Sequence, residues 1–181
     1  MHLLGDAERV LVACATPAAG LPTVDAAGYF RTWTASPDRS RDARAARFTR
    51  IVASAYRLPG LRAHWADLSG AAVRAVGALD PSACVATQGH VLSVHELART
   101  LVTEATVHHL DVLVEVSGPP PAGLQVSLQV FSDLPAGVLG ARGPPLPGDA
   151  ERWLLLSGRL PLTSADRVVL GAAADRFPLL S

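Results

Sequence analysis

The stretch Leu97–Val116, LARTLVTEATVHHLDVLVEV, decides the fold, because it is typical of a single long helix. Ser93 and Glu96 precede it with the S-x-x-E spacing of a capping box, which marks a helix start. Apolar residues occur almost all round the helix, and helices of this kind are usually buried. We therefore expect a helical protein that is organised around this segment.

One strip of this helix is polar and carries Glu104, His108 and Asp111. Glu104 and His108 are four residues apart, so their side chains point the same way, about one turn apart. A carboxylate and an imidazole so placed can share a metal ion or a proton, and a metal ion would need a further ligand from elsewhere. The alternative is that this strip, together with Glu115, is only the solvated face of a packed helix.

The composition limits the classes of protein to which the chain can belong. The chain has 181 residues, 49% of them hydrophobic, and its formal net charge is zero. These values predict a packed globule with one core, or a main domain with a small companion. A neutral chain argues against partners that are bound through charge, so we expect no nucleic-acid and no membrane partner. No apolar run reaches the roughly 18 residues of a membrane helix.

The segment Leu11–Cys14 looks like a lipoprotein cleavage box, but charged residues occupy the place of the apolar region that a signal peptide needs. We therefore expect a cytoplasmic protein. The two cysteines, Cys14 and Cys84, are isolated and lack the spacing of a disulfide framework or a metal motif. Both are expected to be buried structural thiols.

Helical spacing of apolar residues predicts further helices over 2–14, 40–56 and 61–79. His64 flanks the apolar stripe of the third of these helices and is expected to be structural. The second helix has an expected inner stripe of Ala45, Phe48, Val52 and Ala55.

Proline and glycine are frequent in the segments between these helices. We expect residues 16–38 to be mostly loop, Pro59-Gly60 to be a turn, and residues 80–92 to be a connection. The run Ser117–Pro121 ends the long helix and predicts a stiff linker.

The residues after the linker predict a smaller unit. Its expected elements are a short helix over 124–134, a loop over 140–149, a buried strand over 153–156 and a last helix capped by Thr163. The chain therefore reads as a mainly α protein with two domains, a helical bundle over 1–117 and a small α/β domain over 123–181.

Two motifs resemble the mycothiol-dependent maleylpyruvate isomerase family of DinB-like four-helix bundles. HLLGD at residues 2–6 resembles a segment of the family's second helix in which the His is a metal ligand. EATVHHLD at residues 104–111 resembles the family's E-x-x-V-H-x-x-D segment, which supplies a Glu and a His as the other two ligands. The tail from Ser157 to Ser181 also resembles the C-terminal domain of many members.

The resemblance implies a DinB-like bundle that is incomplete at its N-terminus, because the ligand His is already residue 2. It further implies a divalent metal ion, zinc in the first place, held by His2, Glu104 and His108 with a fourth position open. Mycothiol is the implied thiol cosubstrate, and a metal-bound thiol or water is the expected nucleophile. The expected reaction is isomerisation of a small electrophilic substrate, or thiol transfer to it.

Further residues follow from this ligand set. Asp6 and Asp111 each lie one turn beyond a ligand His and would hold the imidazole tautomers, unless both are ordinary surface acids. Arg99 is a candidate for binding an anionic substrate or cosubstrate, with a surface role as the alternative. His109 is expected to be a core or rim residue.

Two other readings of the same residues stay open. One is a non-catalytic metal-binding bundle with a binding or regulatory role. The other is a non-haem iron(II) site, which also uses two His and one carboxylate, but such triads usually lie on a β-barrel. The sequence does not identify the substrate, the metal or the oligomeric state.

Overall fold

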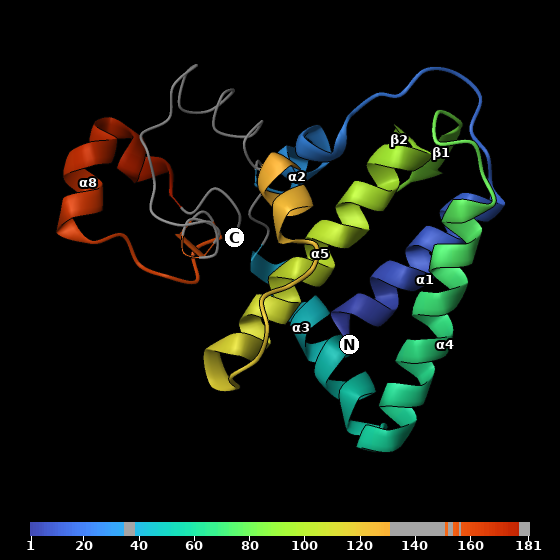
Figure 1. The fold of residues 1–181 in the computed structure, drawn as a ribbon, viewed down its shortest axis with the longest axis horizontal. Coiled ribbons are helices and arrows are strands. Elements are labelled where there is room, and N and C mark those ends of the chain that lie inside the picture. The colour runs from blue at the N-terminus through green and yellow to red at the C-terminus, as the bar shows by residue number, and fades with distance from the viewer. Residues whose placement is uncertain (35–38, 131–150, 152–153, 156, 178–181) are drawn as a thin grey trace. The chain divides into compact units, whose positions relative to one another are not determined.

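The structure is a computed structural model that describes the chain except for residues 35–38, 131–150, 152–153, 156 and 178–181. The described part is mainly helical with a small antiparallel sheet (Figure 1), which confirms the expected mainly α class. None of the described helices is long and apolar enough to cross a bilayer. The elements are α1 (His2–Ala15), α2 (Ala26–Thr34), α3 (Arg39–Ser54), α4 (Leu58–Gly77), β1 (Cys84–Thr87), β2 (His90–Ser93), α5 (Val94–Glu115), α8 (Ser164–Leu170) and the 3₁₀ helix η1 (Gly171–Arg176).

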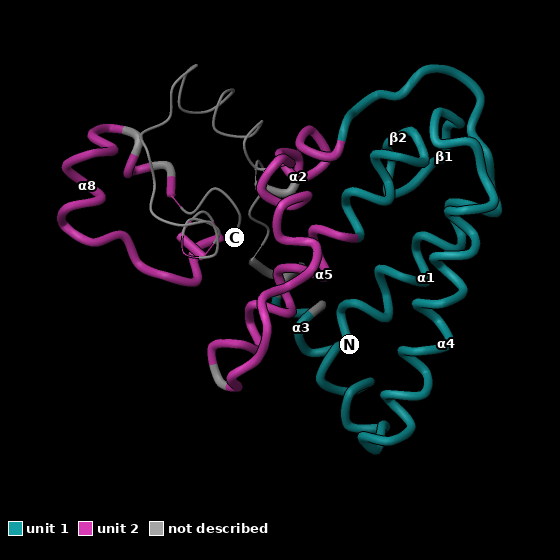
Figure 2. Tube along the Cα trace, in the orientation of Figure 1, with its two compact units in different colours: residues 1–25, 36–101 teal, residues 26–35, 102–181 magenta. Residues whose placement is uncertain are grey.

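The chain divides into two compact units (Figure 2). Unit 1 is made of residues 1–25 and 36–101, and unit 2 of residues 26–35 and 102–181. The long helix α5 begins in unit 1 and ends in unit 2. The DinB-like topology and the expected domain boundary near residue 117 stay predictions.

The core of unit 1 forms where α1 packs against α4 and β1. The helix α1 confirms the helix expected over 2–14 and buries one residue at every third position, as a helix with a single apolar face does. The start of α5 contributes Val94 and Leu97 to the same core. The buried members on α1, α4 and β1 are Ala7, Val10, Ala13, Ala72 and Val85.

A β-hairpin occupies most of the segment that was expected to be a plain connection, and it places β1 antiparallel to β2. Its turn residues, Gln88 and Gly89, both have positive φ, at 49° and 83°. Two successive residues of this kind match the twist of a two-residue hairpin. Glycine takes such a conformation readily, but glutamine rarely does, which is why the sequence pattern did not indicate the turn.

The starts of α5 and α4 test two local predictions, a helix cap and a turn. The backbone N–H of Glu96 donates to the Ser93 hydroxyl at 3.2 Å, so the predicted cap at the start of α5 is present. The turn expected at Pro59-Gly60 is wrong, because both residues lie in the first turn of α4. Proline is tolerated there, since the first N–H groups of a helix have no intrahelical partner.

The helix α3 confirms the expected helix over 40–56, but its expected inner stripe does not enter a core. Phe48 is 68% exposed, Ala55 is exposed and Val52 is half-buried. The side chain of Ala45 lies outside the described residues. Apolar spacing therefore identified the helix without identifying what its apolar face meets.

Unit 2 contains a helix that the sequence did not predict. Residues 16–38 were expected to be mostly loop, yet α2 forms within them and buries Ala26, Ala27, Tyr29 and Phe30. The rings of Tyr29 and Phe30 meet edge to face, with centroids 5.5 Å apart and planes at 80°. Burial of these aromatic residues stabilises a helix that contains a glycine and has weak intrinsic propensity.

The C-terminal part of unit 2 differs from the expected small α/β domain. Residues 124–130 are helical as predicted, but Leu154 and Leu155 are helical where a strand was expected. Among the described residues after 117 no strand is present, so the α/β prediction is wrong for them. The expected loop over 140–149 lies outside the described residues.

The predicted cap of the last helix is present. The Thr163 hydroxyl accepts from the backbone N–H of Asp166, and the backbone N–H of Thr163 donates to the Asp166 carboxylate at 2.8 Å. This reciprocal capping box starts α8, and η1 follows directly.

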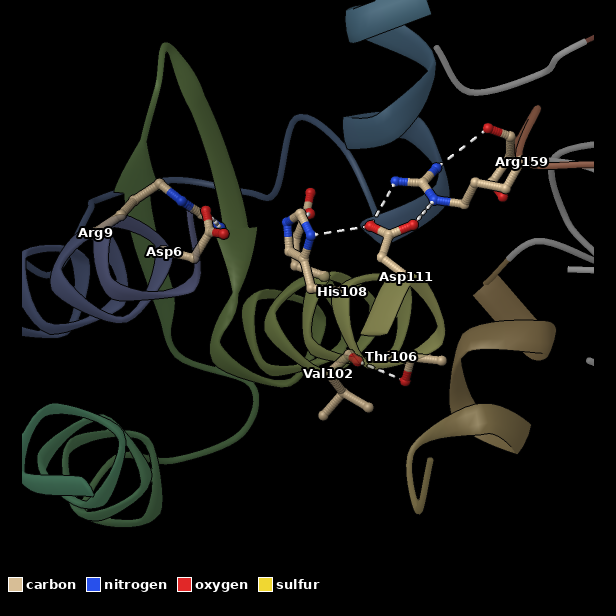
Figure 3. A network of polar contacts seen from close by, with 9 residues as sticks. Asp6, Arg9, Val102, Thr106, His108, Asp111 and Arg159 are labelled. Carbon is tan, nitrogen blue, oxygen red and sulfur yellow. Dashed lines mark hydrogen bonds and ion pairs between the residues drawn. The ribbon is translucent and has the colours of Figure 1, made fainter. Parts of the chain in front are cut away.

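Gly123 lies close to α5, at the start of the helical segment 124–130. A Cβ atom at this position would lie 2.7 Å from both the Thr106 Oγ1 and the Val102 Cγ1 atoms. Thr106 is fixed there, because its hydroxyl donates to the Val102 carbonyl oxygen at 2.9 Å (Figure 3). Ser127 and Val130, which follow on the helix, are fully buried.

We predict that Gly123→Ala lowers the free energy of unfolding by about 1–3 kcal/mol, because the added methyl group overpacks this contact. Urea unfolding followed by circular dichroism measures the change. Val102→Ala, which removes one of the two clashing groups, should partly restore stability in the double variant. Gly77→Ala, where a Cβ meets nothing within 4 Å, is the control. An unchanged midpoint in Gly123→Ala would contradict the close packing.

Candidate functional site

The polar strip of α5 keeps its three expected members close together. The His108 Nε2 atom lies 3.9 Å from the Glu104 Oε2 atom. The His108 Nδ1 atom lies 3.2 Å from the Asp111 Oδ2 atom (Figure 3). A carboxylate can only accept, so the Nδ1–H of His108 donates to Asp111 in this bond. In the neutral imidazole the Nε2 lone pair then faces Glu104. This strip is half-buried, with side-chain exposures between 22% and 36%.

Arg159 extends the strip from a distant part of the chain. Its guanidinium donates to both oxygens of Asp111, from Nε to Oδ1 and from Nη2 to Oδ2, the latter over 3.1 Å (Figure 3). Nη1 donates to the Ser157 carbonyl oxygen at 3.2 Å. A two-pronged contact fixes the carboxylate plane, because the planar fork of arginine matches the two oxygens.

These contacts change the acidity of Asp111. Partial burial alone would raise the pKa of this carboxyl group, but the hydrogen bond and charge of Arg159, followed by those of His108, lower it below its ordinary value. Asp111 therefore remains an anion and an acceptor for His108 Nδ1–H well into the acid range.

The other two residues that the resemblance placed in the site belong to unit 1. His2 begins α1 and is exposed. Asp6 lies one turn later and forms an ion pair with Arg9 at 3.5 Å between Oδ1 and Nη2. Because Glu104 and His108 belong to unit 2, the three-ligand set stays a prediction. Within the described ranges, no three His, Cys, Asp or Glu side chains are grouped as a metal site.

Arg99, the candidate for binding an anion, contacts an acid of its own helix. Its Nη1 atom donates to both carboxylate oxygens of Glu96, at 3.1 Å and 3.2 Å. An anionic ligand would have to compete with this pair, so the binding role of Arg99 stays a prediction.

The two cysteines are free thiols that are half-buried. Burial raises the pKa of the Cys14 thiol, which disfavours its thiolate form. A reaction that needs a thiolate would therefore be better served by an external thiol than by Cys14.

Sequence reasoning missed Arg159 as a partner of Asp111. The two residues are 48 positions apart, and no periodic pattern links such distant positions. The sequence offered one local signal, the SGR run at residues 157–159. In the structure Gly158 has a φ of 72° and turns the chain before Arg159. Glycine followed by a single arginine is too common to indicate a contact by itself.

We predict that Arg159→Gln raises the pKa of Asp111 and lowers stability at neutral pH. A carboxyl group with a depressed folded-state pKa contributes stability above its unfolded pKa of about 3.9, and this contribution is lost as the pH falls through the folded-state value. The pair is about a third exposed, so the loss should stay below about 1 kcal/mol.

The variant and the unaltered protein should therefore converge in stability on acidification. Urea unfolding at neutral and acid pH measures this, and a carbon NMR titration follows the Asp111 carboxyl group directly. Arg167→Gln, which removes an exposed arginine of α8, is the matched control. An unshifted Asp111 titration in Arg159→Gln would contradict the assignment.

Comparisons with known proteins give no independent assignment of the chain. No family model matches it, and neither a curated protein nor a solved structure matches it. The resemblance to the maleylpyruvate isomerase family therefore remains an expectation that rests on the two motifs and the tail quoted above.

Proposed function

We propose that the chain is a metal- and thiol-dependent isomerase or thiol transferase that acts on a small electrophilic substrate. Glu104, His108 and His2 would hold one divalent cation, zinc in the first place, and mycothiol would serve as the thiol. The support comes from the resemblance of the two motifs, and from the way in which His108 is held within unit 2.

The single observation that carries the proposal is the orientation of His108 between two carboxylates. Its Nδ1–H is engaged by Asp111, and its Nε2 atom faces the Glu104 carboxylate at 3.9 Å. Two ligand atoms of a tetrahedral zinc ion, with bonds of roughly 2.0–2.1 Å, lie about 3.3 Å apart. A small rotation of either side chain would close this difference, so Glu104 and His108 are compatible with two positions of such a site.

The neighbouring residues would act on the ligand and not on the substrate. Asp111 fixes the tautomer of His108 and increases the basicity of its Nε2 atom, as carboxylates next to metal-ligating histidines do. Arg159 holds the plane of Asp111 and keeps it ionised. Removal of either residue should therefore weaken metal binding without removing a ligand.

A divalent cation held by His2, Glu104 and His108 would lower the pKa of a bound thiol and would so supply a nucleophile for an electrophilic carbon. For an isomerisation, addition of the thiolate to a cis double bond would permit rotation, and its departure would give the trans product. The chain's own residues would position the thiol and keep the imidazole in the correct tautomer.

We predict that the purified protein binds close to one equivalent of zinc, and that the double variant Glu104→Ala, His108→Ala loses it. Asp111→Asn should keep the stoichiometry but lower the affinity by about 10- to 100-fold. Competition with a chromogenic chelator measures both effects. His109→Ala, which removes the adjacent imidazole of the same helix, is the matched control and should retain zinc.

Zinc that remains stoichiometric in the double variant would contradict the ligand assignment. Zinc binding without any thiol-dependent turnover of electrophilic substrates would instead favour the non-catalytic metal-binding bundle. Loss of zinc in His2→Ala would support the third ligand, and unchanged affinity in that variant would exclude it.

A further inference from the structure

Unit 1 contains a pocket that none of the α5 residues of the proposed metal site lines. It has a volume of about 880 Å³, which lies within the range of about 300–1,000 Å³ typical of small-molecule sites. Its lining comes from α1, α3 and its C-terminal extension, α4 and β1. All of these segments belong to unit 1.

A phenol–imidazole pair stands in the wall of this pocket. The Tyr56 hydroxyl oxygen lies 2.7 Å from the His64 Nδ1 atom, and the two rings stack with centroids 5.8 Å apart and planes at 23°. Both side chains are half-buried. In one tautomer Nδ1–H donates to the Tyr56 oxygen, and the phenolic O–H can then donate to a ligand.

Another part of the lining is apolar and comes mainly from α3. This part explains why apolar side chains of α3 are exposed. Phe48, Val52 and Tyr56 follow one another at intervals of four residues, so they lie on one face of the helix and its extension, and all three line the pocket. Phe48 is 68% exposed because it faces this hollow and not a packed core. Leu4 from α1 adds a further apolar surface.

The charges in the lining do not favour a charged ligand. The Arg9 guanidinium is balanced by Asp6, whose Oδ1 atom lies 3.5 Å away. Glu8 adds a carboxylate that is exposed to solvent. A ligand carboxylate would meet the carboxylates of Asp6 and Glu8 as well as the Arg9 guanidinium, so these side chains offer it no excess of positive charge.

We propose that this pocket binds small uncharged molecules that combine an aromatic ring with an amide or a similar carbonyl group. The ring would lie against Phe48 and Val52, and the carbonyl oxygen would accept a hydrogen bond from the Tyr56–His64 pair. The Tyr56–His64 pair and the apolar wall of this site are separate from the metal site, but His2 and Asp6 also border the pocket.

Benzamide is a minimal probe of this chemistry, and benzoate is its charged counterpart of nearly equal shape. Proton NMR of the tyrosine rings provides a simple readout, because the chain has only two tyrosines, Tyr29 and Tyr56. We expect benzamide to shift the Tyr56 ring signals in a saturable manner, and benzoate to bind at least about fivefold more weakly.

Tyr56→Phe should weaken benzamide binding by about three- to tenfold, which is the effect of one lost hydrogen bond. Tyr29→Phe makes the same substitution in unit 2 and should leave the affinity unchanged, while it also assigns the remaining tyrosine signals. Val52→Phe, which narrows the pocket at the proposed ring position but keeps the phenol–imidazole pair, should weaken binding. Circular dichroism confirms that each variant is folded.

Several results would overturn the proposal: unshifted Tyr56 signals at saturating benzamide, tighter binding of benzoate than of benzamide, or unaltered affinity in the folded Tyr56→Phe and Val52→Phe variants. A concentration-dependent change of molecular mass that Phe48→Ser abolishes, without any effect of benzamide, would also overturn it by showing that this face joins two copies of the chain. The zinc content of the same variants is measured separately, so that failure here leaves the α5 metal site untouched.

Discussion

Burial of residues along α5 is the constraint on which both units depend. The first turns of this helix place Val94 and Leu97 in the core of unit 1, and its later turns bury Val107 and Leu110 in unit 2. Since helix positions are fixed relative to one another, burying these residues also fixes the direction of the strip that carries Glu104 and His108. The polar strip is therefore held at the edge of the packed core, where its side chains are partly exposed to solvent.

The buried face of α5 is unusual in its chemistry. Thr100, Thr103 and Thr106 are all nearly inaccessible, whereas Val112 and Val114 are more than half exposed. The hydroxyls of Thr100 and Thr106 donate to backbone carbonyls of the preceding turn, which satisfies them inside the helix and permits burial. A hydrophobicity pattern assigns these residues the wrong way round, because it treats a satisfied hydroxyl as polar and an exposed valine as apolar.

Local signals in the sequence predicted most of the helices and part of the candidate site. Capping at Ser93 and Thr163 and the helical spacing of α1 depend only on residues within a few positions of one another. The contact of His108 with Asp111 has the same origin, since residues three apart on a helix are neighbours.

What depends on tertiary packing escaped prediction. The helix α2 forms because Tyr29 and Phe30 are buried, and burial is not visible in a glycine-containing segment flanked by prolines. Arg159 and the Tyr56–His64 pair became candidates only through contacts between separate elements.

The division of the chain into units has a consequence for the way in which the protein must fold. The chain passes from one unit to the other after residue 25, after residue 35 and after residue 101, so neither unit is a continuous segment. During synthesis, residues 26–35 emerge long before most of the residues with which they are grouped. Closing that long loop carries an entropic cost before its contacts form, which favours slow and mutually dependent folding over independent maturation of two modules.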